Sequence, residues 1–123
     1  QLNTILSSFL PKGFENKVLA KVFQALRIEV NHEMQALKDV LIQLPSLVKK
    51  GGIISFITYH SVEDRIVKRF IQNGCFDSEP PKNKFGVADI PFKKNFKFIS
   101  PSKKEIKSNS RARSAKLRSA VKT

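Results

Sequence analysis

The sequence has little of what several classes of protein need. It contains one cysteine, Cys75, and two histidines, so we expect no internal disulfide and no zinc site. No apolar run approaches the roughly 18 residues that a membrane span requires. The glycine-rich loops that bind nucleotide phosphates, such as Gly-x-Gly-x-x-Gly, are also missing. These absences favour a cytoplasmic protein without a metal centre.

Charge of one sign is plentiful and unevenly distributed. The 23 Lys and Arg residues outnumber the 10 Asp and Glu residues, which gives a net charge of +13. Residues 93–123 hold 11 of the basic residues and one acid, Glu105, whereas residues 1–92 are close to neutral. This distribution indicates contact with a polyanion, most often nucleic acid. A solvated, partly disordered tail is the alternative.

The spacing of apolar residues predicts one long amphipathic helix over residues 16–44. Apolar side chains recur there at steps of three or four residues, a mean near the helical 3.6. We expect this stripe to face a core, and Pro45 to end or kink the helix. Residues 1–15 contain Pro11 and Gly13 and are expected to be irregular.

A short β-branched and aromatic run follows at residues 53–59. Because it is almost continuously apolar, it predicts a strand buried on both faces within a parallel sheet. A second helix is predicted over residues 61–73, begun by Ser61 and Asp64 in a capping-box pattern and ended by Gly74. Helix, strand and helix with short connections indicate an α/β fold.

The remainder of the chain is predicted to hold two further strands between loops. Prolines and glycine indicate a loop over residues 75–95, followed by a short strand at residues 95–99. Residues 101–114 are expected to form a basic loop. Alternation of apolar and polar side chains over residues 115–121 predicts a closing strand with one buried face.

The turn between the first strand and the second helix is a candidate site. Ligands of open α/β sheets bind outside the carboxyl ends of the strands, where His60 and Ser61 stand. His60 either hydrogen-bonds a base or ribose, or holds the neighbouring loop; Ser61 either does the same or caps the helix. Glu63 and Asp64 suit the helix dipole and disfavour a free phosphate at this helix start. Arg65 either orients the acids or meets a phosphate.

A second candidate site lies in the basic C-terminal segment. Arginine makes bidentate contacts with phosphates, so a dense basic run is suited to a nucleic-acid backbone. The residues that this pattern indicates are Arg111, Arg113, Lys116 and Arg118.

Three separated segments resemble one family, the ribosomal RNA small-subunit methyltransferase H group. They are FQALRIEVN (residues 23–31), ISFITYHSVEDRIVK (residues 54–68) and SRARSAKLR (residues 110–118). Their order and spacing match the last third of the family, and the resemblance covers residues 17–74 and 100–122.

The resemblance implies an enzyme that transfers a methyl group from S-adenosyl-L-methionine to N4 of a cytidine in 16S rRNA. The implied fold is the C-terminal part of a class I, Rossmann-like methyltransferase. Residues 1–15 would end a helical substrate-binding insertion, and residues 16–123 would form the C-terminal half of the methyltransferase domain, with a basic loop and closing strand at residues 100–123. The family's cofactor loop has no match, so no cofactor-binding residue is expected here and the isolated chain is expected to be inactive.

As a hypothesis, His60, Ser61 and Glu63 line the side of the target base. The residues assigned to the phosphates of the partner, 16S rRNA in the small ribosomal subunit, are Arg65, Arg111, Arg113, Lys116 and Arg118. A truncated parallel sheet exposes a strand edge, so we expect the isolated chain to self-associate or to order only in part. The alternative is a stand-alone basic RNA-binding or ribosome-associated module without catalysis.

Overall fold

The chain divides between residues 36 and 37 into two structural units. Its structure, a computed structural model, describes residues 2–7, 9, 13, 15–77 and 79–123. The protein is α/β with a small antiparallel sheet, and the strands formed by the described residues all belong to the second unit. No helix of the described residues is long and apolar enough to span a membrane.

The first unit is helical, and it corrects two expectations from the sequence. Its N-terminal residues were expected to be irregular, yet α1 (Leu2–Ser7) is a helix; Pro11 lies outside the described residues. The single helix predicted over residues 16–44 is two helices, α2 (Glu15–Val30) and α3 (Glu33–Leu47).

The break between α2 and α3 is made by Asn31 and His32. The φ angle of His32 is 51°, in the left-handed region that a helix cannot continue through. Arg27 clasps Glu33 across the break, with Nε 2.8 Å from Oε1 and Nη2 3.0 Å from Oε2. A local turn and ion pair therefore interrupt an otherwise helical pattern.

Only the second half of the predicted apolar stripe faces a core. α2 contains no buried residue, and Phe23 and Leu26 are about half exposed, so the expectation fails for this helix. Leu41 of α3 is fully buried, with Leu37 and Leu44 packed against the same cluster. Pro45 does not end α3, which continues to Leu47.

The second unit is built on a three-stranded sheet of order β1-β3-β2. β1 (Ile53–Thr58) and β2 (Phe92–Lys94) each pair antiparallel with β3 (Lys116–Lys122), so β1 and β2 run in the same direction on either side of it. The predicted strand at residues 95–99 is wrong, because Phe92 enters the core and the ladder forms there. Ile99 contributes only an isolated bridge to Leu117.

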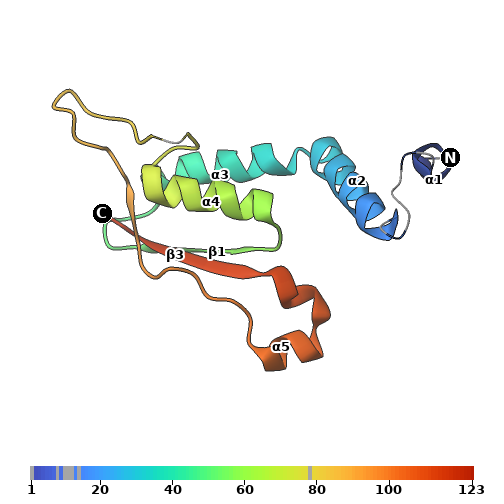
Figure 1. The fold of residues 1–123 in the computed structure, drawn as a ribbon. Helices are drawn as coiled ribbons and strands as arrows, with labels where there is room; N and C mark the ends of the chain where they lie inside the picture. The colour runs from blue at the N-terminus through green and yellow to red at the C-terminus, as the bar shows by residue number, and fades with distance from the viewer. Residues whose placement is uncertain (1, 8, 10–12, 14, 78) are drawn as a thin grey trace. The chain divides into compact units, whose positions relative to one another are not determined.

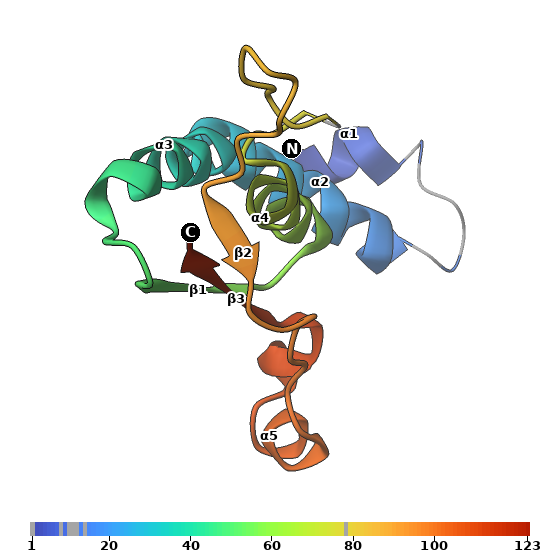
Figure 2. The ribbon, with the colours of Figure 1, turned by 90° about the vertical axis from the view of Figure 1, so that its left-hand side faces the viewer.

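Within the described second unit, two helices pack on one face of the sheet, and the opposite face remains largely exposed. Residues 37–47 of α3 and the helix α4 (Ser61–Asn73) lie on the same face (Figures 1 and 2). Side chains from both helices and all three strands form the core there, namely Leu41, Ile54, Val67, Phe70, Ile71, Phe92 and Ala120. On the opposite face Ile53 is 64% exposed and Ile57 61%. The prediction that this strand is buried on both faces within a parallel sheet is therefore wrong for the described residues.

α4 confirms the second predicted helix at both ends. It spans Ser61–Asn73, and Gly74 ends it with a φ of 71° while donating its N–H to the Phe70 carbonyl. A Cβ at Gly74 would lie 2.8 Å from the Asp89 carbonyl oxygen, so a side chain is excluded on steric grounds as well.

The basic C-terminal segment is part of the fold. The predicted loop at residues 101–114 is wrong: Ser102 caps a short helix α5 (Lys103–Ser108) through its hydroxyl oxygen, and the 3₁₀ helix η1 (Ser110–Ser114) follows. The closing strand is confirmed as β3, which lies in the middle of the sheet. Most cations of this segment are therefore held on ordered backbone.

Candidate functional site

The turn after β1 is held by a reciprocal cap between His60 and Glu63. His60 is the N-cap of α4, and its Nδ1 accepts the backbone N–H of Glu63 at 3.4 Å. The Glu63 carboxylate reaches back and accepts the backbone N–H groups of Tyr59 at 2.9 Å and His60 at 3.4 Å. This is a capping box with histidine in the place usually taken by serine or threonine. The predicted box of Ser61 and Asp64 is wrong by one residue.

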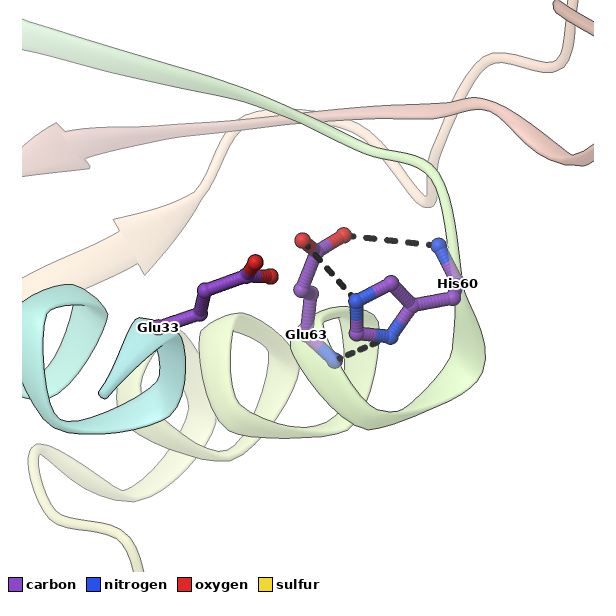
Figure 3. A group of neighbouring side chains, drawn as sticks. All are labelled: Glu33, His60 and Glu63. Carbon is purple, nitrogen blue, oxygen red and sulfur yellow. Dashed lines mark hydrogen bonds and ion pairs between the residues drawn. The ribbon is translucent and has the colours of Figure 1, made fainter. Parts of the chain in front are cut away.

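Both ring nitrogens of His60 face Glu63 (Figure 3). Since Nδ1 accepts a hydrogen bond, the neutral ring carries its proton on Nε2. Nε2 lies 3.0 Å from Glu63 Oε1, but without hydrogen-bond alignment, and no other group in the described structure bonds this buried atom. The His60 ring is therefore committed to the helix start, with one N–H that no protein group fully satisfies.

The side chains on either side of His60 are accessible. Tyr59 is 57% exposed, and Ser61, the first residue of α4, is exposed as well. They stand at the carboxyl end of β1, the edge that favours ligands in α/β sheets. Of the three residues predicted to line the base, Ser61 thus offers a free surface, whereas His60 and Glu63 chiefly shape the turn.

Asp64 forms a buried ion-pair cluster with two cations of β3. Its Oδ1 lies 2.6 Å from Arg118 Nε, and its Oδ2 lies 3.1 Å from Arg118 Nη2 and 3.2 Å from Lys116 Nζ. The Asp64 side chain is 11% exposed, as is that of Arg118. We call Asp64, Lys116 and Arg118 the Asp64 cluster. It joins the first turn of α4 to a strand more than fifty residues away in sequence.

Electrostatics in the Asp64 cluster favour the charged carboxylate. Burial raises the pKa of Asp64, but the hydrogen bonds and charges of Arg118 and Lys116 outweigh it, so the net pKa is lowered. Phe98 packs against both cations, with Arg118 Cζ at 5.4 Å and Lys116 Nζ at 5.5 Å from the ring centroid. Lys116 and Arg118, predicted as phosphate contacts, thus have an internal partner.

Arg111 and Arg113 differ from these cations. Both are exposed on η1, and only Ala112 between them is buried. η1 leads directly into β3, whose first residue, Lys116, pairs with Thr58 at the end of β1. The two arginines therefore lie at the same end of the sheet as the turn at Tyr59–Ser61. Arg65 is also exposed, on α4.

Sequence reasoning missed the partner of Asp64 and the function of His60 as a cap. Local pattern suggested a pair of Asp64 with a neighbour, whereas its ion-pair partners come from β3, and Thr58 of β1 donates a hydrogen bond to it. A usable signal for another missed feature existed: Arg65, Lys68 and Arg69 recur at helical spacing and form a basic stripe on α4. Within the described part of residues 37–123, no three metal-ligating side chains converge.

Comparison with known proteins gives a consistent result. A sequence model of the MraW methylase family matches residues 1–123. A protein named ribosomal RNA small subunit methyltransferase H from Christiangramia forsetii is 54% identical over 99% of this chain. Proteins of the same name from Flavobacterium johnsoniae and Flavobacterium psychrophilum are 51% and 52% identical, over 99% and 98% of it. The chain spans only 40–42% of the length of these relatives.

Proposed function

The chain belongs to the MraW methylase family, and from this premise we propose that it is the C-terminal part of a cytoplasmic enzyme that methylates small-subunit ribosomal RNA. The proposed reaction transfers a methyl group from S-adenosyl-L-methionine to N4 of a cytidine in 16S rRNA. The fold would be the end of a class I, Rossmann-like methyltransferase domain covering residues 16–123, preceded by the end of a substrate-binding insertion at residues 1–15.

The observation that carries this proposal is the unfinished sheet. Within the described residues β1 pairs only with β3, so its other edge has no partner strand. On the face that carries Ile53 and Ile57, α5 comes near only Ile57, and both large apolar side chains remain more than 60% exposed. Open edges and apolar faces are normally covered in a complete domain. Both features support a larger sheet that continues beyond β1.

The turn after β1 does not suit the cofactor. At the strand-to-helix turn after β1, the Glu63 carboxylate already accepts the N–H groups of Tyr59 and His60. The Glu63 carboxylate also places negative charge at the start of α4, which opposes the carboxylate of S-adenosyl-L-methionine. We therefore assign the cofactor to the part of the enzyme outside this chain, and no catalytic step of the cofactor is assigned to these residues.

The task left to this chain is to hold the RNA and present the base. The amino group of cytosine is a weak nucleophile because its lone pair is delocalised into the ring, so positioning must supply much of the catalysis. The base must also leave its stack to reach an enzyme pocket. We propose that Ser61 and the turn set by His60 and Glu63 line the target base. Arg111 and Arg113 on η1 would hold the neighbouring phosphates.

In the complete enzyme, variants of the turn can separate the capping of α4 from direct contact with the target base. His60→Asn keeps an N-cap side chain, whereas His60→Ala removes it; Glu63→Gln keeps the capping box without charge. We expect His60→Ala to lower methyl transfer to 16S rRNA at least tenfold and His60→Asn to retain most of it. Full activity of His60→Ala, measured with radiolabelled cofactor, would remove the turn from the site.

A basic RNA-binding module without catalysis is the competing function. It requires the chain to be a finished domain, so the two hypotheses differ in the behaviour of the exposed sheet. We expect the isolated chain to self-associate through β1 and its outer face, and Ile57→Lys to reduce this. A monodisperse monomer that melts cooperatively, measured by sedimentation and circular dichroism, would favour the module.

A further inference from the structure

A basic groove runs between α4 and the segment that begins at β2. Two adjoining cavities form it, one of about 260 Å³ and a more open one of about 910 Å³, and Lys68, Ile71, Gln72 and Lys94 line both. All of the lining residues belong to residues 65–123, within one structural unit. The groove is therefore a continuous feature of the second unit.

The walls of this groove carry unpaired positive charge. α4 contributes one stripe and the segment at β2 the other, and their exposed cations are Arg65, Lys68, Arg69, Lys93, Lys94 and Lys97. None of the described residues that line either cavity is acidic, and none of these six cations forms an ion pair in the described structure. Like charges gathered in one groove repel one another, so a polyanion would stabilise the arrangement.

The dimensions and the aromatic content indicate which polyanion. From Arg65 to Gln72 the stripe on α4 extends about 10 Å at 1.5 Å per residue. A stacked strand advances about 3.4 Å per nucleotide, so the groove suits about three nucleotides. Phe96 and Phe98 are half-buried and line the narrower cavity between the cations. Aromatic rings beside a basic channel allow bases to stack, which favours single-stranded nucleic acid over a lipid surface or an acidic protein.

We propose that the groove between α4 and β2 binds about three nucleotides of single-stranded RNA, with phosphates on the two lysine- and arginine-bearing walls and a base against Phe96. This contact rests on the proposed function, in which the same RNA reaches the turn at Ser61. It lies apart from η1, and of residues 110–118 only Arg118 lines it, so it adds a second contact with the RNA besides that of Arg111 and Arg113.

The first experiment neutralises the groove and compares it with an equal loss of charge elsewhere. Lys68→Gln/Lys94→Gln/Lys97→Gln is measured against Lys49→Gln/Lys82→Gln/Lys84→Gln, whose lysines are exposed and line neither cavity. Binding of the complete enzyme to a labelled single-stranded oligoribonucleotide is followed by fluorescence anisotropy from low to high salt.

We expect the groove variant to bind about 10- to 100-fold more weakly at 0.1 M salt. Its slope of log affinity against log salt should be shallower by about 2, because each phosphate contact on a single strand contributes about 0.7. The control variant should change affinity less than about twofold. Equal weakening of both variants would overturn the proposal, since net charge alone would then explain binding.

The second experiment asks whether the groove reads bases. Phe96→Leu keeps an apolar side chain but removes the stacking surface, so RNA affinity should fall about fivefold or more with an unchanged salt slope. Binding to inorganic polyphosphate, which has no bases, should not change. If Phe96→Leu leaves RNA affinity intact, or lowers both affinities equally, the assignment to single-stranded RNA is wrong. Unchanged circular dichroism melting checks that each variant folds.

The result for the groove can be distinguished from the result for the proposed methyltransferase activity. Normal RNA binding by the groove variant, together with normal methyl transfer in the complete enzyme, would reject the groove and leave the methyltransferase assignment standing. Absence of methyl transfer by the complete wild-type enzyme would reject that assignment, whereas the binding data would still decide the groove.

Discussion

The Asp64 cluster and the basic groove use the same types of side chain, lysine and arginine, for different purposes. In the cluster, Arg118 and Lys116 converge on a buried carboxylate and fasten α4 to β3. In the groove, Lys68 and Lys94 face an open cavity with no acid in its lining. The basic residues of this chain therefore form two classes, one structural and one suited to binding. Burial and ion-pair partners distinguish the two classes, whereas amino-acid composition does not.

The largest expected effect comes from removing the acid of the Asp64 cluster. Asp64→Ala leaves two cations without a partner beside the core, so we expect a loss of about 2–4 kcal/mol in the free energy of unfolding. Asp77→Ala, at an exposed acid, should cost less than about 0.5 kcal/mol. Urea denaturation of both variants makes the measurement, and equal stability would mean that the cluster does not fasten the strand.

A matched pair of arginines tests the division directly. Arg118→Met should lower stability by about 1–3 kcal/mol, because it removes the bidentate partner of Asp64. Arg113→Met, on the exposed face of η1, should lower it by less than about 0.5 kcal/mol but should reduce the salt slope of RNA binding by about 0.7. If Arg113→Met lowered stability and Arg118→Met lowered only the salt slope of RNA binding, the division into structural and binding cations would be wrong.

The pH dependence of stability gives a smaller effect with a defined sign. The folded pKa of Asp64 is lowered, so its contribution is complete above the unfolded value of about 3.9 and is lost as pH falls through the folded value. We expect the stability difference between wild type and Asp64→Asn to be constant above about pH 5 and to narrow below about pH 4. A difference that stayed constant down to pH 2 would show that Asp64 is not stabilised as an anion.

The smallest effect is expected at Lys116. Its side chain is 38% exposed, and solvent screens its bond to Asp64. Lys116→Gln should therefore change the free energy of unfolding by less than about 1 kcal/mol. If its effect in urea denaturation equals that of Arg118→Met, the two cations contribute equally to the stability of the cluster.

The elements that the sequence predicted well are those specified by neighbouring residues. α4, its end at Gly74 and the strands β1 and β3 follow from local apolar patterns and from the glycine at the helix end. The break at His32 was not predicted, because a left-handed histidine has no reliable signal in the sequence. β2 was misplaced by three residues, since its position depends on the burial of Phe92 against Phe70 and other residues distant in sequence.

The sequence predicted where the turn at His60 lies in the fold but not the contacts that its side chains make, and the assignment of this turn as a functional site stays a prediction. The turn at His60 was located from its position after a predicted strand, and that position does not depend on how the side chains bond. The ion-pair partners of Asp64 come from β3, and no local rule links residues 64 and 118. The basic stripe of α4 was readable, but its counterpart at Lys94 and Lys97 becomes part of one groove only when β2 lies at the edge of the sheet.

The position of β3 also bears on how the protein is made. Among the described strands, the last one along the chain separates the other two, so β1 and β2 both lack β3 as a partner until residues 116–122 have been synthesised. During elongation α4 can form, but Asp64 must remain solvated until Arg118 arrives. Pairing across such separations is slow, because loop closure precedes any gain from contact. The nascent chain therefore cannot complete the three-stranded sheet of the second unit before β3 has been synthesised.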